Sequence, residues 1–348
     1  MSELRATSLD RREAAALISG LYRALLGRAA DPSGLAYWTG RLMDGTPVAD
    51  VLAAITASEE YAQARTVAHD SDATRQRVLA TAAPLLRREL TIVDIGAQEL
   101  EGESHVYAPL TGAGLPYRII GFEPQEDKIE ASRRANPDSR VTLYPTFIGD
   151  GGRHTFHINN EDATSSLLPL NDALNRELVD LSHLATVQRL DVATSRLDDV
   201  LAGTGPVDFL KLDIQGFELP VLRHAQDVLG RTNVIHCEVS FAPIYENQGL
   251  FSEVEQLLRA AGFHFIDFSS QCHYASHCPS GNRSRDRLGW GDALFLRAPD
   301  ALDPDALLAQ CLTLLLVYDK PSLAESLARR FDAIGGTALA AAFAQERA

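Results

Sequence analysis

The stretch TIVDIGAQELEGESHVY, residues 91–107, decides the fold class of this chain. It begins with the apolar and β-branched residues of a buried strand, turns at Asp94-Ile95-Gly96-Ala97, and continues into polar sequence. A strand followed by a glycine turn is typical of the first βα unit of a nucleotide-binding α/β domain. The glycine run G-x-G-x-x-G, which holds a dinucleotide, is missing after this strand. The stretch therefore predicts a nucleotide site but leaves the nucleotide open.

Strand patterns alternate with helical patterns from about residue 90 to 299, which predicts a largely parallel α/β sheet. The predicted strands are 91–95, 117–123, 141–148, 207–214, 233–239, 264–268 and 293–297. A loop without a helical pattern separates the last two strands. We therefore expect them to form an antiparallel pair at the edge of the sheet.

Helical sequence flanks this region on both sides. The pattern predicts four segments: a helical module at 1–70, a polar helical connector at 71–89, the α/β domain at 90–299 and C-terminal helices at 300–348. In the first segment, Gly27 is expected to end the first helix, Asp31 to cap the second and Thr46 to cap the third. Tyr37 and Trp38 are expected in the core of the module rather than in a ligand site.

Composition excludes several classes of protein. The net charge of -15 argues against a general nucleic-acid binder, whose surface is basic. Four cysteines are too few for a disulfide scaffold in 348 residues. The first residues lack the apolar core of a signal peptide, and no apolar run is long enough to span a membrane. We therefore expect a cytoplasmic protein.

The acid in the first turn favours one class of ligand. Backbone amides at a helix N-terminus hold a pyrophosphate, and the carboxylate of Asp94 would repel it. That carboxylate suits a cationic ligand, such as the ammonium and sulfonium groups of S-adenosylmethionine. Glu123, at the end of the second strand in GFEP, is placed to accept hydrogen bonds from both ribose hydroxyls. The alternative is that Asp94 and Glu123 are solvated acids on a non-catalytic α/β domain.

The third predicted strand ends in FIGDGG, residues 147–152. Gly149 and Asp150 follow at the same edge of the sheet, where an adenine ring would lie. The alternative is that this Gly-Asp-Gly-Gly run is an ordinary turn and that Asp150 contacts no ligand.

The sequence KLDIQGFE, residues 211–218, resembles the K-x-D-x-x-G-x-E signature of the FkbM family of S-adenosylmethionine-dependent methyltransferases. VDIGA, GFEP, TSSLL (164–168), RLDDVL (196–201), the stretch 237–263 and WGDALFLR (290–297) resemble the family in the same order. The resemblance covers about residues 90–299. It implies a Rossmann-like class I methyltransferase sheet with an antiparallel last strand, and S-adenosyl-L-methionine as cofactor.

One part of the chain departs from the family pattern, which continues the first turn with Ala-Asn-x-Gly. Here Gln98 replaces the asparagine, and the second glycine comes late, at Gly102. The donor-binding residues that the resemblance and the strand ends imply are Asp94, Gly96, Ala97, Gln98, Glu123, Pro124, Gly149, Asp150 and Asp213.

Two acids are candidates for the acceptor side. Asp213 and Glu238 each end a central strand, and either could accept the proton of an acceptor hydroxyl or instead bind the donor. Glu218 lies early in a helix, where a negative charge is stabilising without any catalytic role.

The loop 269–291 is expected to cross the same edge of the sheet. It supplies His273 as a candidate base, with His277 as an alternative. We predict no metal site, because each of Cys272 and Cys278 is adjacent to a histidine, and neighbouring residues rarely converge on one tetrahedral ion. The basic residues of this loop are either solvated or contact an anionic acceptor. They are Arg283, Arg285 and Arg287.

The resemblance implies O-methylation of a small-molecule or glycan hydroxyl, in cell-surface polysaccharide or secondary-metabolite assembly. YRALLGRAADPSGLAYW, residues 22–38, resembles a phycobilisome-linker-like module, which we interpret as a docking site for a protein partner. The rival hypotheses are a nicotinamide-dependent oxidoreductase on the same fold and a non-catalytic interaction protein. The oligomeric state stays open, and a homo-oligomer is one of the alternatives.

Overall fold

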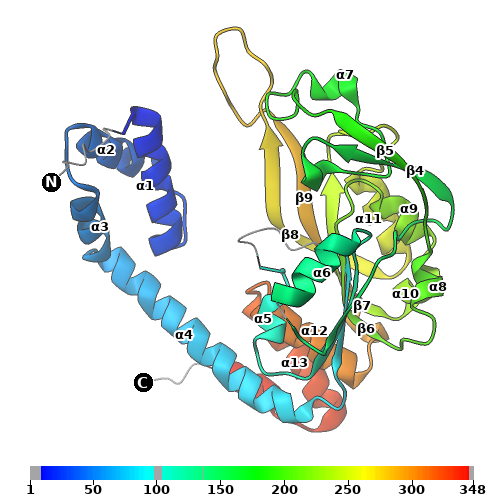
Figure 1. Ribbon diagram of the computed structural model, residues 1–348. Helices are drawn as coiled ribbons and strands as arrows, with labels where there is room; N and C mark the ends of the chain where they lie inside the picture. The colour runs from blue at the N-terminus through cyan, green and yellow to red at the C-terminus, as the bar shows by residue number, and fades with distance from the viewer. Residues whose placement is uncertain (1–8, 98–103, 136, 345–348) are drawn as a thin grey trace. The chain divides into compact units, whose positions relative to one another are not determined.

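The computed structural model describes residues 9–97, 104–135 and 137–344. The chain divides into two compact units, one up to Arg77 and the other from Val78 to Phe343. Figure 1 shows the helices and strands of both. Among the described helices, none combines the length and the apolar character that crossing a bilayer requires.

The first unit is helical. Its helices are α1 (Arg11–Leu26), α2 (Pro32–Met43), α3 (Val48–Thr56) and α4 (Glu59–Ala82), of which α4 continues into the second unit. Asp10 caps α1 through a capping box with Glu13, which satisfies amides that a helix start leaves unpaired. The core of the unit consists of Ile18, Tyr22, Val51 and Ile55.

Two of the predicted helix ends in this unit are confirmed and one is wrong. Gly27 ends α1 in the left-handed conformation, at φ 66°, and Asp31 caps α2 by accepting from the amide of Gly34. Thr46 does not cap α3, which begins after Pro47 without a side-chain cap. Tyr37 is 58% exposed, so its predicted core position is wrong, whereas Trp38 is half-buried against the core.

The second unit is built on a seven-stranded sheet with the order β3-β2-β1-β6-β7-β9-β8. Its strands are β1 (Leu90–Ile95), β2 (Tyr117–Phe122), β3 (Val141–Tyr144), β6 (Val207–Leu212), β7 (Thr232–Ser240), β8 (Phe263–Tyr274) and β9 (Arg287–Arg297). β9 runs antiparallel to both of its neighbours, and the other pairs are parallel. The predicted fold class is confirmed.

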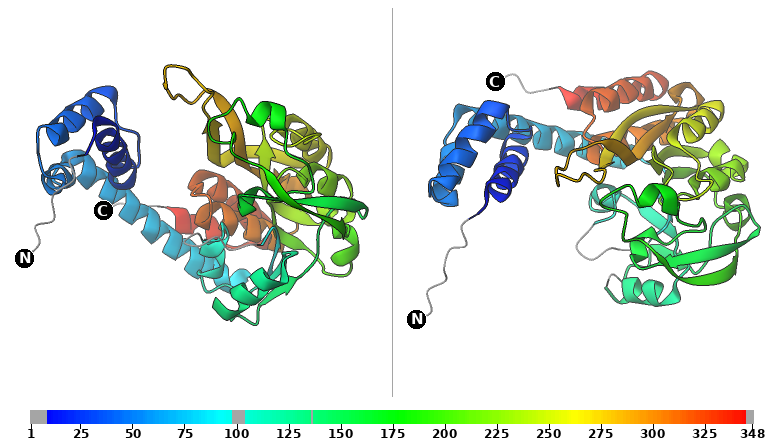
Figure 2. Two further views of the ribbon diagram at one scale, coloured as in Figure 1. Left: turned by 45° about the horizontal axis from the view of Figure 1, so that its top comes forward. Right: turned by 90° about the horizontal axis from the view of Figure 1, so that it is seen from above.

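The central strands read as continuous apolar runs because both faces of the sheet are covered. Every residue of β1 is buried. One face packs against α5 (Ala108–Thr111), α12 (Pro304–Leu316) and α13 (Pro321–Gly335). The other face packs against α8 (Leu197–Val200), α9 (Glu218–Arg223), α10 (Gln226–Gly230) and α11 (Phe251–Ala260), as Figure 2 shows from two further directions. The C-terminal helices are thus part of the sheet's own core.

Three predictions about strands need correction. β3 ends at Tyr144 and not at residue 148, because Pro145 lacks the amide that the ladder needs. β8 and β9 extend far into the region predicted as a loop and leave only residues 275–286 between them. A separate antiparallel ribbon of β4 (Arg153–Asn159) and β5 (Thr186–Ala193) was not predicted.

The remaining short elements complete the second unit. α6 (Glu126–Ala135) follows β2, and α7 (Asp172–Asn175) lies between β4 and β5 in the chain. Single 3-10 turns occur at Ala83–Leu85, Asp162–Thr164, Pro299–Ala301 and Leu339–Phe343.

Candidate active site

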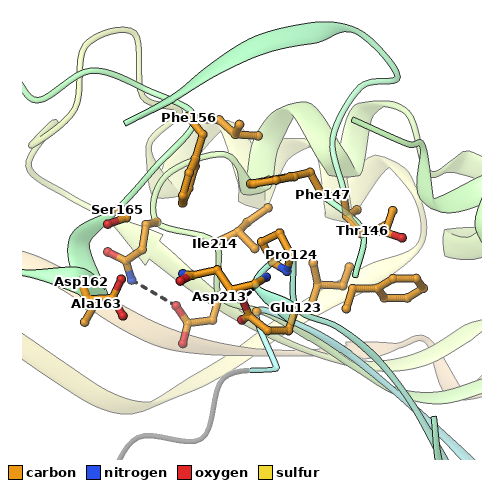
Figure 3. A pocket seen from close by; sticks show the side chains of 17 residues that line it. Glu123, Pro124, Thr146, Phe147, Phe156, Asp162, Ala163, Ser165, Asp213 and Ile214 are labelled. Atoms are coloured by element: carbon orange, nitrogen blue, oxygen red, sulfur yellow. Dashed lines mark hydrogen bonds between the residues drawn. The ribbon is translucent and has the colours of Figure 1, made fainter. Parts of the chain in front are cut away.

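A cleft of about 160 Å³ lies at the carboxyl ends of β1, β2 and β6. β1 stands between β2 and β6, where the strand order reverses and open α/β sheets bind their ligands. Figure 3 shows Phe147 and Phe156 on one side of this cleft, with Pro124 and Ile214 facing them. The cleft is lined by Ile95, Gly96, Phe122, Glu123, Pro124, Gln125, Thr146, Phe147, Ile148, Phe156, Asp162, Ala163, Ser165, Leu167, Asp213, Ile214 and Gln215.

The turn after β1 requires glycine at position 96. Gly96 has φ +80°, and a Cβ atom there would lie 1.9 Å from the carbonyl oxygen of Asp213. The amides of Gly96 and Ala97 both donate to the carbonyl of Phe122, at 3.1 and 3.2 Å. These two amides are therefore already used within the sheet. They are not presented to a phosphate group, unlike the amides of a dinucleotide turn.

Glu123 lies in the cleft where the sequence places it. Its side chain is buried, and its Oε1 accepts the backbone amide of Gln125 at 2.9 Å. Burial raises the pKa of Glu123 above its ordinary value. One oxygen is thus fixed by the backbone, and the carboxyl group lines the cleft together with Pro124.

Asp94 does not line the cleft, which corrects its predicted role as a direct donor contact. Its side chain is fully buried, 3.2 Å from Lys211 Nζ and 3.3 Å from His105 Nδ1, and it accepts from the hydroxyl of Tyr107 at 2.8 Å. Burial raises the pKa of Asp94, but the charges of Lys211 and His105 and their hydrogen bonds outweigh burial, so the pKa lies below its usual range. The carboxylate stays ionised, and its charge is balanced by neighbouring groups inside the protein.

Lys211 connects that buried acid to the cleft. Its ammonium donates to the carbonyl of Gly96 at 3.1 Å and lies 3.6 Å from Asp213 Oδ2. Burial lowers the pKa of Lys211, but the neighbouring carboxylates raise it by a larger amount. The pKa therefore lies above its ordinary value, and the lysine stays charged. The lysine thus fixes the turn, the buried acid and the cleft acid together.

The predicted adenine contacts Gly149 and Asp150 also lie outside the residues that line the cleft. Asp150 instead accepts from the amide of Gly152 and pairs with His154 Nε2 at 2.7 Å, which closes the turn before β4. The chain bends away from the sheet at Pro145. For that reason Thr146, Phe147 and Ile148 reach the cleft instead.

Some of the remaining predicted donor contacts line the cleft and others do not. Pro124, Gly96 and Asp213 line the cleft, whereas Ala97 is buried between Ile129 and Leu143. Gln98 lies outside the described residues.

A glutamine joins the two candidate acids. Asp213, whose side chain is 39% exposed, lines the cleft, and Gln215 Nε2 donates to its Oδ1 at 3.2 Å and to Glu238 Oε2 at 3.1 Å. Burial raises the pKa of Glu238 well above its ordinary value, and the charges of Asp213, Glu218 and Asp292 add to this effect. Gln215 was not among the predicted site residues, and its place inside the KLDIQGFE motif is the one sequence feature that could have pointed to it.

Glu218 has a structural role in this motif. Its Oε1 accepts the amides of Ile214 and Gly216, at 2.9 and 3.2 Å, and so holds the turn between β6 and α9. Burial raises the pKa of Glu218 to about 7. The buried carboxyl group thus stabilises the backbone of its own loop through hydrogen bonds.

The pKa of Glu218 predicts a stability profile. Between pH 4.5 and about 7 the folded protein keeps a proton on Glu218 that the unfolded chain has released, so its contribution to stability falls as pH rises. Glu218→Gln keeps the acceptor oxygen and removes the titration. Relative to this variant, the wild type should lose on the order of 1–3 kcal/mol of unfolding free energy between about pH 5 and pH 8. Urea unfolding at both pH values measures the difference.

Glu246→Gln serves as the control, because Glu246 is exposed and its substitution should leave the profile of the wild type unchanged. Parallel profiles for the wild type and Glu218→Gln would contradict the prediction.

The other candidate base, His273, lies within β8 and not in a loop. Its Nδ1 accepts from Arg285 at 2.8 Å, and it is not among the residues that line the cleft. Arg283 pairs with Asp180. Within the described residues, no group of three or more histidine, cysteine, aspartate or glutamate side chains is arranged to hold a metal ion.

Residues 94–265 match the family described as Methyltransferase FkbM domain, and residues 8–64 match DUF4214, a domain of unknown function. The chain is similar to the precorrin-6y C5,15-methyltransferase of Geobacter metallireducens, with 12% identity, a TM-score of 0.31, and coverage of 64% of this chain and 89% of that chain. It is also similar to the magnesium protoporphyrin IX methyltransferase of Synechocystis, with 13% identity, a TM-score of 0.30, and coverage of 84% and 100%. The comparison with curated proteins finds no match.

Structural similarities this distant add nothing to the assignment, which depends on the sequence match. Residues 94–265 of this chain thus belong to the FkbM methyltransferase family, and residues 8–64 form a phycobilisome-linker-like module of the DUF4214 family.

Proposed function

We propose that this protein is an S-adenosylmethionine-dependent O-methyltransferase whose acceptor is a hydroxyl group of a sugar or glycan. The observation that carries the proposal is the cleft at the reversal of strand order, which combines Gly96, Glu123, an apolar wall and an exposed acid. A glycan hydroxyl as acceptor follows from the family resemblance.

The side chains of the cleft are chemically complementary to the parts of S-adenosylmethionine. Glu123 offers a carboxyl group to a pair of ribose hydroxyls, and Phe147 and Phe156, 5.0 Å apart between ring centroids, offer an apolar wall to a purine. Asp213 supplies a partly exposed carboxylate at the end of β6 for a cationic group. The donor would supply a methyl group on a positively charged sulfur. Holding the acceptor in line with it is the main task of the protein.

The chain's own residues would handle the acceptor proton. Glu238 keeps its proton to a higher pH than an ordinary glutamate, because burial and the neighbouring acids raise its pKa. That property favours Asp213 as the group that accepts the proton from the acceptor hydroxyl. Glu238 then acts as a hydrogen-bond donor at the same edge of the sheet.

The rival hypotheses predict different ligands for the cleft. A nicotinamide-dependent oxidoreductase needs free turn amides for a pyrophosphate, and those of Gly96 and Ala97 are used within the sheet. A non-catalytic protein with a decayed site would not bind the donor. Calorimetry with S-adenosylhomocysteine and with a nicotinamide dinucleotide separates the three. Binding of the dinucleotide alone, or of neither, would overturn the proposal.

Glu123→Gln is expected to weaken binding of S-adenosylhomocysteine by about 10–100-fold, because a neutral amide replaces a charged acceptor of two hydroxyl groups. Calorimetry measures the change. Glu126→Gln is the control, since Glu126 is exposed three residues further on and does not line the cleft. Equal affinities for both variants would remove Glu123 from the donor site.

Asp213→Asn is expected to lower turnover by about 10²–10⁴-fold, because the amide cannot accept the proton of the acceptor. Turnover is measured as release of S-adenosylhomocysteine with a panel of neutral and charged sugars. Glu238→Gln keeps a hydrogen-bond donor at its position, so its loss should be smaller. Unchanged turnover in both variants, with donor binding intact, would exclude both acids from proton transfer.

We further propose that the DUF4214 module docks a protein partner and that the methyltransferase region extends over about residues 90–299. Pull-down with the full chain and with a variant of the module surface would test the docking role. Tyr37→Ser is a suitable substitution, because Tyr37 is exposed and outside the core of the module.

A further inference from the structure

Gln215 occupies a backbone conformation that a glutamine rarely adopts. Its φ is 56°, in the left-handed region, where a side chain costs roughly 1–2 kcal/mol relative to the right-handed form. Glycine or asparagine would adopt it at lower cost. A glutamine at this position indicates that its side chain contributes something that neither of these can supply.

The surrounding structure holds this conformation in place. The hydroxyl of Ser166, which is buried, donates to the carbonyl of Gln215 at 2.6 Å. The carboxyl group of Glu218 accepts the amides on either side, from Ile214 and Gly216. The direction of the Gln215 side chain is therefore fixed by contacts from two separate segments.

The side-chain amide contacts three functional groups. Its Nε2 donates to Asp213 Oδ1 at 3.2 Å and to Glu238 Oε2 at 3.1 Å, and its Oε1 accepts from the hydroxyl of Tyr245 at 3.1 Å. Tyr245 is buried, and its hydroxyl oxygen also lies 2.8 Å from the carbonyl of Thr164, so the two acceptors share its single proton. Oε1 of the amide thus faces the tyrosine hydroxyl, and Nε2 faces the two acids.

We propose that Gln215 is a positioning residue that holds the carboxyl groups of Asp213 and Glu238 in fixed places at the carboxyl ends of β6 and β7. One N–H bond engages Oδ1 of Asp213, whose Oδ2 lies 3.6 Å from Lys211 Nζ, and the other engages Oε2 of Glu238. The importance of this arrangement for catalysis rests on the proposed function. The arrangement itself is a property of the apoprotein.

Removing the two N–H bonds should change how both acids titrate. A hydrogen bond donated to a carboxylate favours its charged form, so the titration midpoints of both acids should rise when the bonds are lost. The charged groups that also act on Glu238 are Asp213, Glu218, Asp292 and Lys211, and the substitutions below leave them all in place.

Two substitutions separate the side-chain contacts from the backbone strain. Gln215→Asn tolerates the left-handed conformation but is one methylene shorter, so it cannot reach both acids. Gln215→Glu keeps the length and replaces the donor with a third carboxyl group. Gln248→Asn is the matched control, because Gln248 is a buried glutamine that donates to Ser240 Oγ at 2.7 Å and contacts neither acid.

The measurement is a carbon-13 NMR titration of the carboxyl groups in the full chain. Asp213→Asn and Glu238→Gln identify the two resonances by their absence. Gln215→Asn should raise both midpoints by about one pH unit, and Gln215→Glu should raise them by more, because like charges add to the loss of the donor. Gln248→Asn should leave them unchanged. Unchanged midpoints in both Gln215 variants, whatever their effect on thermal stability, would overturn the proposal.

Calorimetry of the wild type with S-adenosylhomocysteine tests the proposed function separately. Shifted midpoints without binding would retain the positioning role of Gln215 and reject the methyltransferase function. Binding of S-adenosylhomocysteine with unshifted midpoints would support the methyltransferase function and reject the positioning role of Gln215. With any sugar that supports turnover, the pH–rate profile of Gln215→Asn should move in the same direction as the titrations, with kcat falling more than the KM for the donor rises.

Discussion

Gly96→Ala is expected to abolish binding of S-adenosylhomocysteine and to lower the unfolding free energy by about 2–5 kcal/mol. The new methyl group would stand 1.9 Å from the carbonyl oxygen of Asp213, far inside the contact distance. Because the obstacle is backbone and not a flexible side chain, the ends of β1 and β6 would have to separate. The left-handed φ of +80° adds strain to this overlap.

Gly203→Ala separates the two effects. Gly203 has φ +77°, and a Cβ atom there would meet nothing within 4 Å. Its loss should be about 1 kcal/mol, from strain alone, with donor binding intact. Urea unfolding and calorimetry measure both quantities. Equal destabilisation of the two variants would mean that the close approach of Gly96 to Asp213 is not needed for the fold.

Lys211→Met is expected to destabilise the protein by about 3–5 kcal/mol at neutral pH, because it leaves the buried carboxylate of Asp94 without its main counter-charge. In this variant burial should raise the pKa of Asp94 above its unfolded value. The folded state then binds a proton that the unfolded chain releases. The defect should therefore shrink as pH falls and grow as pH rises through neutrality.

The double variant Lys211→Met with Asp94→Asn should recover part of the lost stability, because no buried charge remains. Lys320→Met is the control for loss of a lysine. Its ammonium lies 2.7 Å from Asp267 in a more exposed ion pair, so the loss should stay below about 1 kcal/mol. A Lys211→Met defect that is independent of pH, with no recovery in the double variant, would refute the ion-pair explanation.

The positions of the main acids could be read from the sequence because each lies near or directly after the end of a strand with a clear apolar pattern. Asp94 comes directly before the glycine turn, Glu123 follows β2, and Asp213 follows β6. Parallel strands bring their carboxyl ends to one edge, so strand recognition alone gathers these residues. Two of them, Glu123 and Asp213, line the cleft.

The role of Asp94 could not be read in the same way. A strand-end acid has the same sequence pattern whether it faces a ligand or a buried lysine. Its partner Lys211 lies 117 positions further along the chain and meets it only because β1 and β6 pair in the register Asp94 to Lys211. Asp213, and not Asp94, is therefore the carboxylate that lines the cleft and can face a cationic ligand.

Local patterns of apolar and turn residues are enough to identify the segments that form the sheet, the position of the glycine turn and the family that the methyltransferase region resembles. Three contacts are visible in the folded chain alone: Lys211 neutralises Asp94, Phe147 rather than Asp150 reaches the cleft, and Gln215 joins two acids. The physical reason is that ion pairs and hydrogen bonds between distant segments depend on strand register and chain direction to within about an ångström, and a local pattern does not encode distances of that kind.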